Sequence, residues 1–513
     1  MKGDFSRITF DAAHHFSRVL MQQGRVTVDA DANEQAAILL HYVRTLARDL
    51  IGPCGGPPDA LGFQLSVDPS AKPAAVRIGA GRYYVDGILC ENDAARTYAD
   101  QPDYTPLPDD PLLAELASTK PAKSFWLYLD VWERHLTFVE DDRIREVALG
   151  GPDTATRTKV VWQVKALALP PPDLATPTAI GTACTGPLGA LTAIPAGRMA
   201  AELDPGQQIK DPCVIAPDAR YRGVENQLYR VEIHRGGTIA KPGDASAAAA
   251  GATDSGITFT WSRDNGSVAS AWLGTEGNDL VVASARGFSA GAWVELSDDA
   301  QELRGEPGVL VKLSSVDGDR LTIDPTSVPS PASTAWSTGL SRPKVRRWDQ
   351  TENDDLTLRD GAIPIPTGSH WIDLEDGVRV QFEAGSSGDV QYRSGDYWLI
   401  PARVATGDID WPRTGTATGG STADFLPPRG IEHHHAPLGW LTVDASGGWT
   451  VTSCLCTLNP LSPCERPKPA TVTPVSPGPD NRPSPASPPA PQPTPAPGRP
   501  RPGGPSNPGR TPR

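Results

Sequence analysis

The sequence lacks the long apolar segments that mark membrane and secreted proteins. No run approaches the 18 or more apolar residues that a membrane-spanning helix needs. The N-terminal stretch MKGDFSRITFDAAHHF contains no apolar core of signal-peptide length. The seven cysteines are an odd number spread through 513 residues, a pattern unlike a secreted disulfide framework. We therefore expect a protein made in the cytoplasm, with neither a signal peptide nor a transmembrane segment.

The sequence is also poor in catalytic motifs. H-E-x-x-H and G-x-G-x-x-G do not occur in a context that suits them. The stretch GGPDTATRTK, residues 150–159, lacks the residue order of a phosphate-binding loop and leads into a strand pattern, so we interpret it as a turn. No Cys–His or Ser–His pair stands out. The sequence predicts no catalytic residue, no cofactor and no metal. The histidines are scattered: His14, His15, His41, His135, His234, His370 and the run 433–435.

Positive charge is scarce outside the C-terminus. The formal net charge is −14, and residues 466–513 carry seven Lys/Arg and one Asp, so this tail is +6 and the rest of the chain −20. Such a body argues against a nucleic-acid-binding protein that relies on a basic surface. Eighteen of these last 48 residues are Pro and none is aromatic. We expect a disordered, partly polyproline II tail that cannot bury a core.

The stretch VTVDADANEQ, residues 26–35, allows two interpretations. Asp29, Asp31 and Asn33 have the spacing of the first ligands of a calcium loop. The sixth and twelfth positions of that loop are Glu and Leu here, where calcium binding needs Gly and a bidentate Glu. We therefore interpret the stretch as a strand leading into a helix, with Asp31 as the N-cap and Glu34 reaching back to it.

The residues that follow predict an amphipathic helix. Apolar side chains recur every fourth position and end at IGPCGGPP, whose Gly and Pro terminate the helix. We expect this face to hold the helix against the preceding strand. Its residues are Ile38, Tyr42, Leu46 and Leu50, with Leu39 and Val43 beside them.

Beyond this helix nearly every pattern indicates β-structure. Asp-Gly pairs predict hairpin turns within VRIGAGRYYVDGILCEND, residues 76–93, and WIDLEDGVRVQFEAG, residues 371–385. FWLYLDVWERHLTFVE, residues 125–140, is largely apolar on both faces, which predicts a strand covered on both sides. VVWQVKALAL, from Val160, is its expected partner. Residues 168–220 are rich in Pro, Ala and Thr, and we expect a long surface excursion there.

A compact β unit is predicted between about residues 278 and 326, where short strands alternate with Gly-rich turns at a spacing typical of a small barrel. It lies between WSRDNGS and KVRRWDQ, two Trp- and Arg-containing segments that we expect in one sheet. The barrel would then be inserted into a larger β domain. WSRDNGS also ends a strand pattern at an Asn-Gly pair, which favours a hairpin turn.

These patterns predict a mainly β, multi-domain chain of sandwich- and barrel-like units with one N-terminal α-helix. We expect a strand–helix–hairpin domain over 1–120, a β domain over 121–273 and 343–465, a barrel-like insertion over 274–342, and a disordered tail over 466–513.

Acidic residues offer one candidate for chemistry. Asp130 and Glu133, with Glu140, Asp141 and Asp142, contain the carboxyl groups that a glycosidase needs as a pair roughly 5–9 Å apart. An acidic cluster between strands is more often a solvated turn, and we favour that interpretation.

A zinc site is a second candidate. The run His433–His435 lies about 20 residues before three clustered cysteines, Cys454, Cys456 and Cys464. C-x-C-x7-C matches no standard zinc spacing. We favour free thiols and an exposed histidine run, and leave open whether this set binds metal.

Tryptophan is the most frequent aromatic residue, with 13 in the chain, and several stand beside Arg or Asp in strand patterns. Trp beside charged residues on a β surface is typical of protein interfaces and sugar-binding faces, and equally of packing in a β domain, which we favour. The residues concerned are Trp132, Trp261, Trp348, Trp398 and Trp411.

Several long stretches together resemble a known group of sequences. They include MKGDFSRITF, VLMQQGRVTVDADANEQ, RDLIGPCG, YLDVWERHLTFVEDDRIREVALGGPDTATRTKVVWQV, YRGVENQLYRVEIH, TFTWSRDNGSV, KVRRWDQ and YRSGDYWLIPARVATGDIDWP. They are similar to an uncharacterised domain family associated with phage tails and with bacterial gene clusters for phage-tail-like contractile injection systems. The resemblance covers most of residues 1–445 and excludes the Pro-rich tail. It transfers no catalytic residue to this chain.

The resemblance implies a non-enzymatic structural or accessory component of a phage-tail-like particle, at its baseplate, spike or fibre attachment. Its partners would be other tail and baseplate proteins, within an assembly in which this chain is oligomeric, without nucleic acid or membrane insertion. Two alternatives stay open: a module that binds glycans on a target cell through its Trp residues, and a polysaccharide-degrading enzyme that uses Asp/Glu pairs. The sequence leaves the position in the particle, the oligomeric state, any bound glycan and the role of the tail undetermined.

Overall fold

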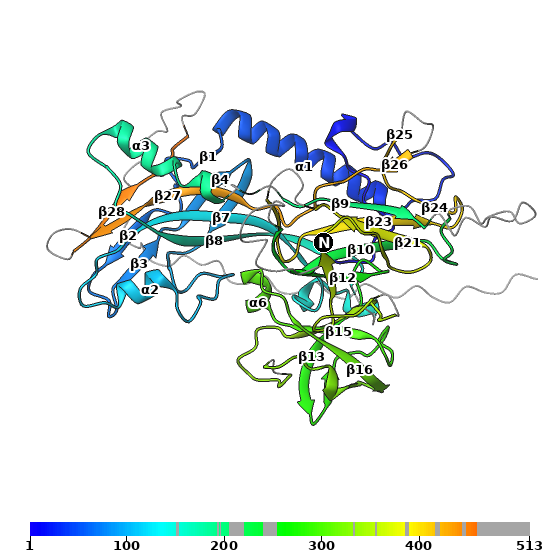
Figure 1. The fold of residues 1–513 in the computed structure, drawn as a ribbon. Helices are drawn as coiled ribbons and strands as arrows, with labels where there is room; N and C mark the ends of the chain where they lie inside the picture. Colours follow the sequence, from blue (N-terminus) through cyan, green and yellow to red (C-terminus); the bar gives the residue numbers. More distant parts are fainter. Residues whose placement is uncertain are drawn as a thin grey trace, which may run out of the picture. The chain divides into compact units, whose positions relative to one another are not determined.

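The computed structural model describes residues 1–149, 153–191, 194, 196–204, 220–239, 254–331, 334–353, 356–384, 389–415, 421–443 and 448–458. The expected disordered tail over 466–513 lies outside these residues. The described chain is mainly β, with 40% strand and 15% helix, which confirms the predicted fold class. Figure 1 shows its elements.

The α-helices are α1 (Asp29–Ile51), α2 (Pro111–Leu116), α3 (Pro177–Thr185), α4 (Leu188–Leu191) and α6 (Asp299–Arg304). Short 3-10 turns are η1 (Ala12–His14), η2 (Asp142–Ile144), η3 (Val147–Leu149) and η4 (Pro325–Ser327).

The strands before the barrel are β1 (Cys54–Gly55), β2 (Leu65–Asp68), β3 (Ala75–Ile78), β4 (Gly81–Val85), β5 (Ile88–Asn92), β6 (Arg96–Thr97), β7 (Ser124–Leu136), β8 (Arg157–Leu169), β9 (Met199–Leu203), β10 (Gln227–Arg235), β11 (Gly237–Ile239) and β12 (Asp254–Ser262). The barrel strands are β13 (Ala269–Glu276), β14 (Asp279–Val282), β15 (Trp293–Ser297), β16 (Val309–Asp317), β17 (Arg320–Ile323) and β18 (Lys344–Trp348). The remaining strands are β19 (Ile363–Pro366), β20 (Ile372–Asp373), β21 (Val378–Phe382), β22 (Val390–Tyr392), β23 (Tyr397–Arg403), β24 (Asp408–Ile409), β25 (Arg413–Gly415), β26 (Ser421–Ala423), β27 (His434–Val443) and β28 (Trp449–Ser453).

The first β body is built on the four-stranded sheet β28-β27-β7-β8. β7 pairs with β8 along its whole length, from Ser124 opposite Leu169 to Leu136 opposite Arg157, which confirms the predicted partner strand. Alternate residues of β7 enter two different cores, one containing Leu127 and the other Trp126. The sheet is therefore covered on both faces, as the apolar pattern on both sides of β7 predicts.

Two small sheets, β1-β4-β5 and β2-β3-β6, complete the core of this body. Val85 stands opposite Ile88 across the turn between β4 and β5, and Asp86 and Gly87 both have positive φ. This is the tight two-residue hairpin that the Asp-Gly pair predicts, because positive φ at both positions matches the strand twist.

The second β body is inserted into the first, between β8 and β27. Its sheet has the order β19-β12-β10-β23-β24, and a second sheet, β20-β21-β9, encloses the same core. The predicted hairpin β20–β21 forms at Asp376-Gly377, both with positive φ. The segment 168–220 is not only a surface excursion: its described part forms α3, α4 and β9.

A closed six-stranded barrel, β13-β14-β17-β16-β15-β18, is inserted in turn into the second body (green to yellow-green in Figure 1). Its flanking strands, β12 and β19, pair with each other. The barrel strands run from Ala269 to Trp348, beyond both ends of the expected range 274–342. KVRRWDQ was expected in one sheet with WSRDNGS, but its strand β18 pairs with β13 and β15 instead. Closing the barrel satisfies two edges that would otherwise stay unpaired.

Helix α1 begins earlier than expected and without the predicted cap. Its N-cap is Val28, which makes no side-chain capping bond, and no strand precedes it. The side chains of Asp29 and Glu34 instead accept hydrogen bonds from Ser6 and Thr9 in the N-terminal segment. The predicted strand–cap junction is therefore wrong, while the helix and its glycine stop at residue 52, with φ of 88°, are confirmed.

The apolar face of α1 is not packed against a strand. Of the six residues expected on it only Ile38 is buried; the others are 51–62% exposed. The expectation that this face holds the helix against the chain is wrong. Helix α1 is anchored by its two buried residues, Ala30 and Ile38, and by the ion pair between Arg44 and Glu133 at 2.8 Å.

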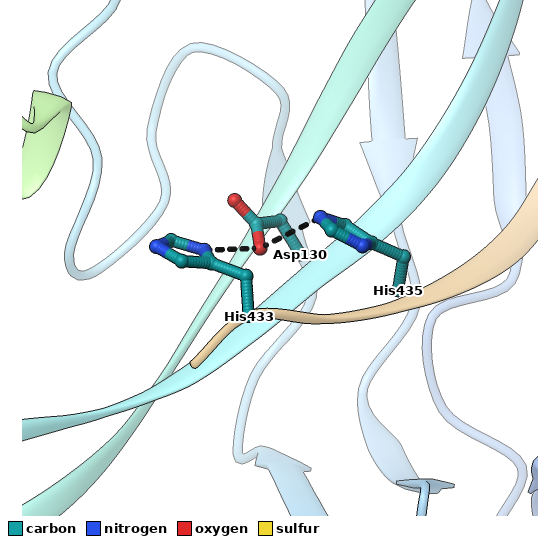
Figure 2. Close-up of side chains that lie close together, drawn as sticks. All are labelled: Asp130, His433 and His435. Atoms are coloured by element: carbon teal, nitrogen blue, oxygen red, sulfur yellow. Dashed lines mark hydrogen bonds and ion pairs between the residues drawn. The ribbon is translucent and has the colours of Figure 1, made fainter. Parts of the chain in front are cut away.

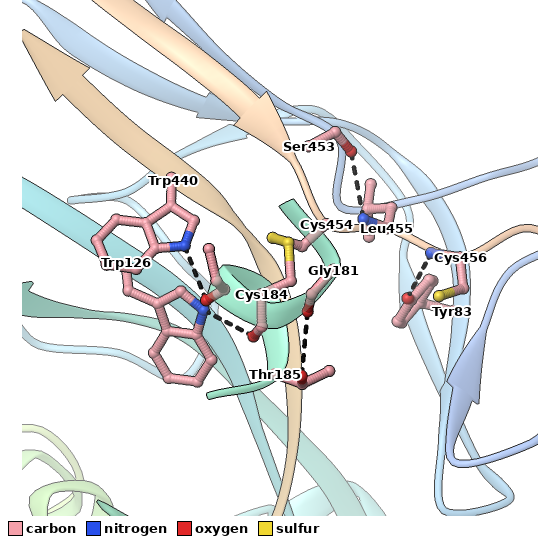
Figure 3. The surroundings of a disulfide bond; sticks show 11 residues. Tyr83, Trp126, Gly181, Cys184, Thr185, Trp440, Ser453, Cys454, Leu455 and Cys456 are labelled. Carbon is pink, nitrogen blue, oxygen red and sulfur yellow. Dashed lines mark hydrogen bonds between the residues drawn. A yellow bond between two sulfur atoms is a disulfide. The ribbon is translucent and has the colours of Figure 1, made fainter. Parts of the chain in front are cut away.

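Cys454 is not a free thiol: it forms a disulfide with Cys184 of α3, 270 residues away in sequence. Figure 3 shows this bond beside two tryptophans of the first sheet. Trp126 and Trp440 donate from their indole nitrogens to the carbonyls of Cys184 and Ala183, at 3.1 and 3.0 Å. The disulfide and these bonds fix α3 over one face of the sheet.

Among the described residues, no helix combines the length and the apolar character that crossing a membrane requires.

We predict that Cys454→Ser in the full chain lowers the free energy of unfolding by about 2–5 kcal/mol, because it opens the 270-residue loop. Denaturant unfolding with and without a reductant measures this. Reduction should bring the wild type to the level of the variant and leave the variant unchanged. Cys456→Ser, which removes a free exposed thiol two residues away, is the matched control and should behave as wild type. Equal stability of wild type and Cys454→Ser under oxidising conditions would contradict the prediction.

Candidate functional site

Asp130 is the one carboxylate inside the otherwise apolar first half of β7. It is 3% exposed, and burying a charge is costly unless it is paired. Lys165 on β8 supplies one partner, with Nζ 2.6 Å from Oδ2. The register of the sheet explains this contact. Asp130 lies opposite Gln163, and Lys165, two residues further along β8, projects to the same side as Gln163.

Two histidines approach the other oxygen of Asp130. His433 Nδ1 lies 2.7 Å and His435 Nε2 3.4 Å from Asp130 Oδ1. Figure 2 shows the two imidazoles pointing toward the carboxylate from the segment that begins β27. His435 is the direct register partner of Asp130, and His433, two residues earlier, projects to the same side because side chains alternate along a strand.

The surroundings fix the orientation of both rings. His433 lies against Trp132, with ring centroids 4.9 Å apart, and the edge of His435 meets Tyr128 at 5.7 Å. Burial opposes ionisation of Asp130, yet His433 and Lys165 outweigh it and hold the pKa of this carboxyl well below its usual range. Burial lowers the pKa of His435, which favours its neutral ring.

The histidine run does not act as one unit. His434 projects to the other side, where its Nδ1 lies 3.0 Å from Asp86 Oδ2. The cysteines are separate as well: Cys454 is in the disulfide, Cys456 is a free exposed thiol, and Cys464 lies outside the described residues. The sequence candidate His433–His435 with three cysteines is therefore not assembled in the described part of the chain. Two of its histidines join Asp130, which the sequence pointed to only as part of an acidic cluster.

A charged cavity of about 160 Å³ has Trp132 in its lining. Met1 and Lys2 enter this cavity, and the amino group of Met1 donates to the hydroxyl of Tyr397 at 2.9 Å. All six glutamates of its lining have a cationic or histidine partner within 4 Å: Glu133, Glu140, Glu232, Glu295, Glu302 and Glu306. Paired carboxylates of this kind are a structural network and do not form a free acid–base pair.

The most buried part of this network joins the barrel to the first body. Lys344 on β18 is fully buried, with Nζ 2.7 Å from Glu140 and 2.8 Å from Glu302. Arg134 of β7 reaches Glu302 at 2.8 Å from the other side. Burial opposes ionisation of Glu140, but Lys344 outweighs it and lowers the pKa of Glu140 to about 2.

The remaining carboxylates of the sequence-selected cluster also have cationic partners. Asp141 pairs with Arg143 at 2.7 Å and Asp142 with Arg145 at 2.9 Å. Together with the partners of Asp130, Glu133 and Glu140, these ion pairs leave no carboxylate of that cluster unpaired for glycosidase chemistry.

The five tryptophans that the sequence singled out are all buried, with exposures of 1–7%. They are core residues and not exposed platforms for a sugar ring. The pentapeptide GFSAG, residues 287–291, has the spacing of a nucleophile elbow that sequence reasoning overlooked. It lies in a loop of the barrel between β14 and β15 instead of a strand-to-helix turn, and residues 269–348 contain no histidine.

The set formed by Asp130, His433 and His435 is thus the one group of three potential ligands within 4.8 Å of one another in the described part of the chain. A signal for it exists in the sequence: histidines two residues apart at a strand start, and a single carboxylate in an apolar strand. Their pairing was not predictable, since 303 residues separate Asp130 from His433.

Acid should weaken the fold through Glu140 and Glu232. Arg230 and Lys2 outweigh the effect of burial on Glu232 and lower its pKa to about 2 as well. Both folded pKa values lie below the unfolded value of roughly 4.3. Their stabilising contribution is therefore fully present above about pH 4.5 and is lost as the pH falls toward about 2.

We predict that the thermal unfolding midpoint falls between pH 5 and pH 2.5, and that it falls less in Glu140→Gln. That variant should already be less stable at pH 7 by roughly 1–3 kcal/mol, because Lys344 loses one of its carboxylates. Differential scanning calorimetry across this pH range measures both effects. Glu225→Gln, at an exposed position, is the control. An unchanged pH profile in Glu140→Gln would refute the assignment.

Comparison with known proteins gives one match. No curated protein and no solved structure is significantly similar to the chain. A family described as a family of unknown function, DUF6519, matches residues 1–172 and 183–493, which covers both β bodies and the barrel. The chain belongs to this family of unknown function.

Proposed function

We propose that the protein is a non-enzymatic structural component of a phage-tail-like particle, and that it enters the assembly as an oligomer paired through α1. The observation that carries this proposal is the uncovered apolar stripe of α1. The resemblance of the long stretches quoted above supplies the kind of particle.

The exposed residues of α1 follow a heptad pattern. They alternate at spacings of four and three residues, which is the repeat of a coiled-coil seam. Four of them are large and 57–62% exposed, and the two alanines are also exposed. The seam consists of Ala32, Ala36, Leu39, Val43, Leu46 and Leu50. Ala30 and Ile38 are buried elsewhere on the helix, and none of the described residues of the chain covers the seam.

The positions beside the seam favour a second copy of this chain as the partner. In coiled coils, charges at these flanking positions select a particular partner and orientation. Here only Asp49 is charged among the flanking residues, which are Asn33, Gln35, Leu40, Tyr42, Ala47 and Asp49. Two identical seams can therefore meet with little like-charge repulsion, although the chain as a whole is acidic. A two-fold dimer would present the same stripe from both sides.

Pairing through α1 would require little additional free energy for helix formation. Nucleation of a helix is unfavourable, and most of the stability of a helix in a protein comes from tertiary packing. α1 is already formed, held by Ile38, by the ion pair from Arg44 to Glu133 and by the N-terminal segment at Asp29. Exposed apolar area on a preformed helix is typical of a protein–protein contact.

The two alternatives have less support. The tryptophans that would stack on a glycan are buried in the cores. The carboxylates that would form a glycosidase pair are engaged by lysine, arginine or histidine side chains.

We predict that Leu46→Glu converts a dimer of about twice 54.4 kDa into a monomer of 54.4 kDa. The introduced charge would lie within the apolar seam and would face apolar side chains of the second copy. Light scattering during size-exclusion chromatography measures the mass. Leu273→Glu is the matched control, because Leu273 is 55% exposed on the barrel, away from α1, and should leave the dimer intact. A monomeric wild type at tens of micromolar would refute pairing through α1.

The particle itself is tested by purifying a tagged copy expressed from its own locus. Mass spectrometry and negative-stain microscopy should recover sheath and tube proteins with rod-shaped particles. Recovery of this protein alone would contradict the structural role, whatever its oligomeric state.

A further inference from the structure

The three side chains Asp130, His433 and His435 converge on one point between β7 and β27. Two imidazole nitrogens and one carboxylate oxygen lie within 4.8 Å of one another, and both nitrogens approach the same oxygen, Asp130 Oδ1. We propose that these three residues bind a divalent transition-metal ion of the zinc class. The proposal does not rest on the pairing through α1.

The spacing of the donor atoms suits a common ion. Zinc ligands lie about 2.0–2.2 Å from the ion, so two ligands of one tetrahedral ion are roughly 3–4 Å apart. The observed separations from Asp130 Oδ1 are 2.7 Å for His433 and 3.4 Å for His435. Small side-chain adjustments therefore suffice, and no strand has to move.

The donor types decide the class of ion. Ca²⁺ and Mg²⁺ take oxygen ligands almost exclusively, and two of the three donors here are imidazole nitrogens. Two histidines and one carboxylate are a donor set for Zn²⁺, Co²⁺ or Fe²⁺, with room for a fourth ligand. Among these, Zn²⁺ needs no redox partner, and Co²⁺ reports the same geometry by its visible absorption.

The neighbouring residues orient these donors. Trp132 and Tyr128 hold the two rings, and Lys165 occupies Asp130 Oδ2 at 2.6 Å. Outer partners of this kind orient metal ligands. Lys165 also limits the carboxylate to a single donor oxygen, and its positive charge weakens the attraction of a cation. We therefore expect moderate affinity, and we expect Lys165→Met to tighten binding.

The ion would connect β7 to the start of β27, where the chain re-enters the first body after the second body. His433 is the last residue before β27, and Asp130 is in the middle of β7. Bound metal would connect these segments, which are 303 residues apart in sequence, and would stabilise the folded chain by mass action.

The test uses the full chain, freed of metal with a chelator and then titrated with Co²⁺ and with Zn²⁺. We expect one Co²⁺ per chain, a visible absorption band that Zn²⁺ abolishes, and a Zn²⁺-dependent rise in the unfolding midpoint. His433→Ala and His435→Ala should each weaken binding by about 100-fold or more, since each removes a direct ligand. His434→Ala is the matched control: it changes the residue between them, which contacts Asp86 instead, and should bind as wild type.

Three results would overturn the proposal. One is the absence of stoichiometric Co²⁺ or Zn²⁺ binding by the wild type, whose fold is checked by circular dichroism without metal. Another is binding that survives both His433→Ala and His435→Ala. The third is equal loss of binding in His434→Ala. Because the wild type is titrated first, a variant that fails to fold does not leave the question open.

Discussion

The pairing of β27 with β7 is the interaction on which the rest of the described fold depends. Seven registered pairs, from His434 opposite Val131 to Leu441 opposite Phe125, join strands that are far apart in the sequence. β27 also contributes Ala436, Leu438 and Leu441 to the core of the first body. The same register places His435 opposite Asp130, so the candidate metal site is a direct consequence of how the first sheet closes.

The second constraint is the buried charge that joins the barrel to the first body. Lys344 is fully buried between carboxylates from two segments, Glu140 after β7 and Glu302 in α6. Such a network contributes less to stability than its Coulomb energy suggests, because both charges lose their hydration. The network instead fixes the position of the barrel on the first body, because a barrel displaced by even a few ångströms would leave an unpaired charge in the interior.

Local features were predictable from the sequence where short-range physics decides them. The Asp-Gly turn at 86–87, the stop of α1 at Gly52 and the two apolar faces of β7 follow from backbone preference and from alternation. The predictions that were wrong concern features that depend on long-range contacts. The N-cap expected at Asp31 does not form; Ser6 and Thr9 donate hydrogen bonds to Asp29 and Glu34 instead. The residues expected to form a strand before the helix pair with no other strand.

Periodicity showed that α1 has an apolar face, but could not show whether that face is covered by this chain or by another molecule. Composition likewise could not place the tryptophans, because Trp beside Arg is as common in a β core as on a binding surface. The sequence pointed to each site residue separately, in different candidate groups. Only the closed sheet brings the carboxylate and the two histidines together.

The nesting of the three β units has a consequence for synthesis on the ribosome. β8 emerges roughly 260 residues before β27, an interval of roughly 13–50 s at about 5–20 residues per second. During that time one edge of β7 lacks its final neighbour, while the strands of the barrel and then those of the second body are completed. The innermost unit is therefore complete first and the N-terminal one last, the reverse of the usual order along a nascent chain. An exposed edge of this length is a place where a chaperone, or another nascent copy, would bind.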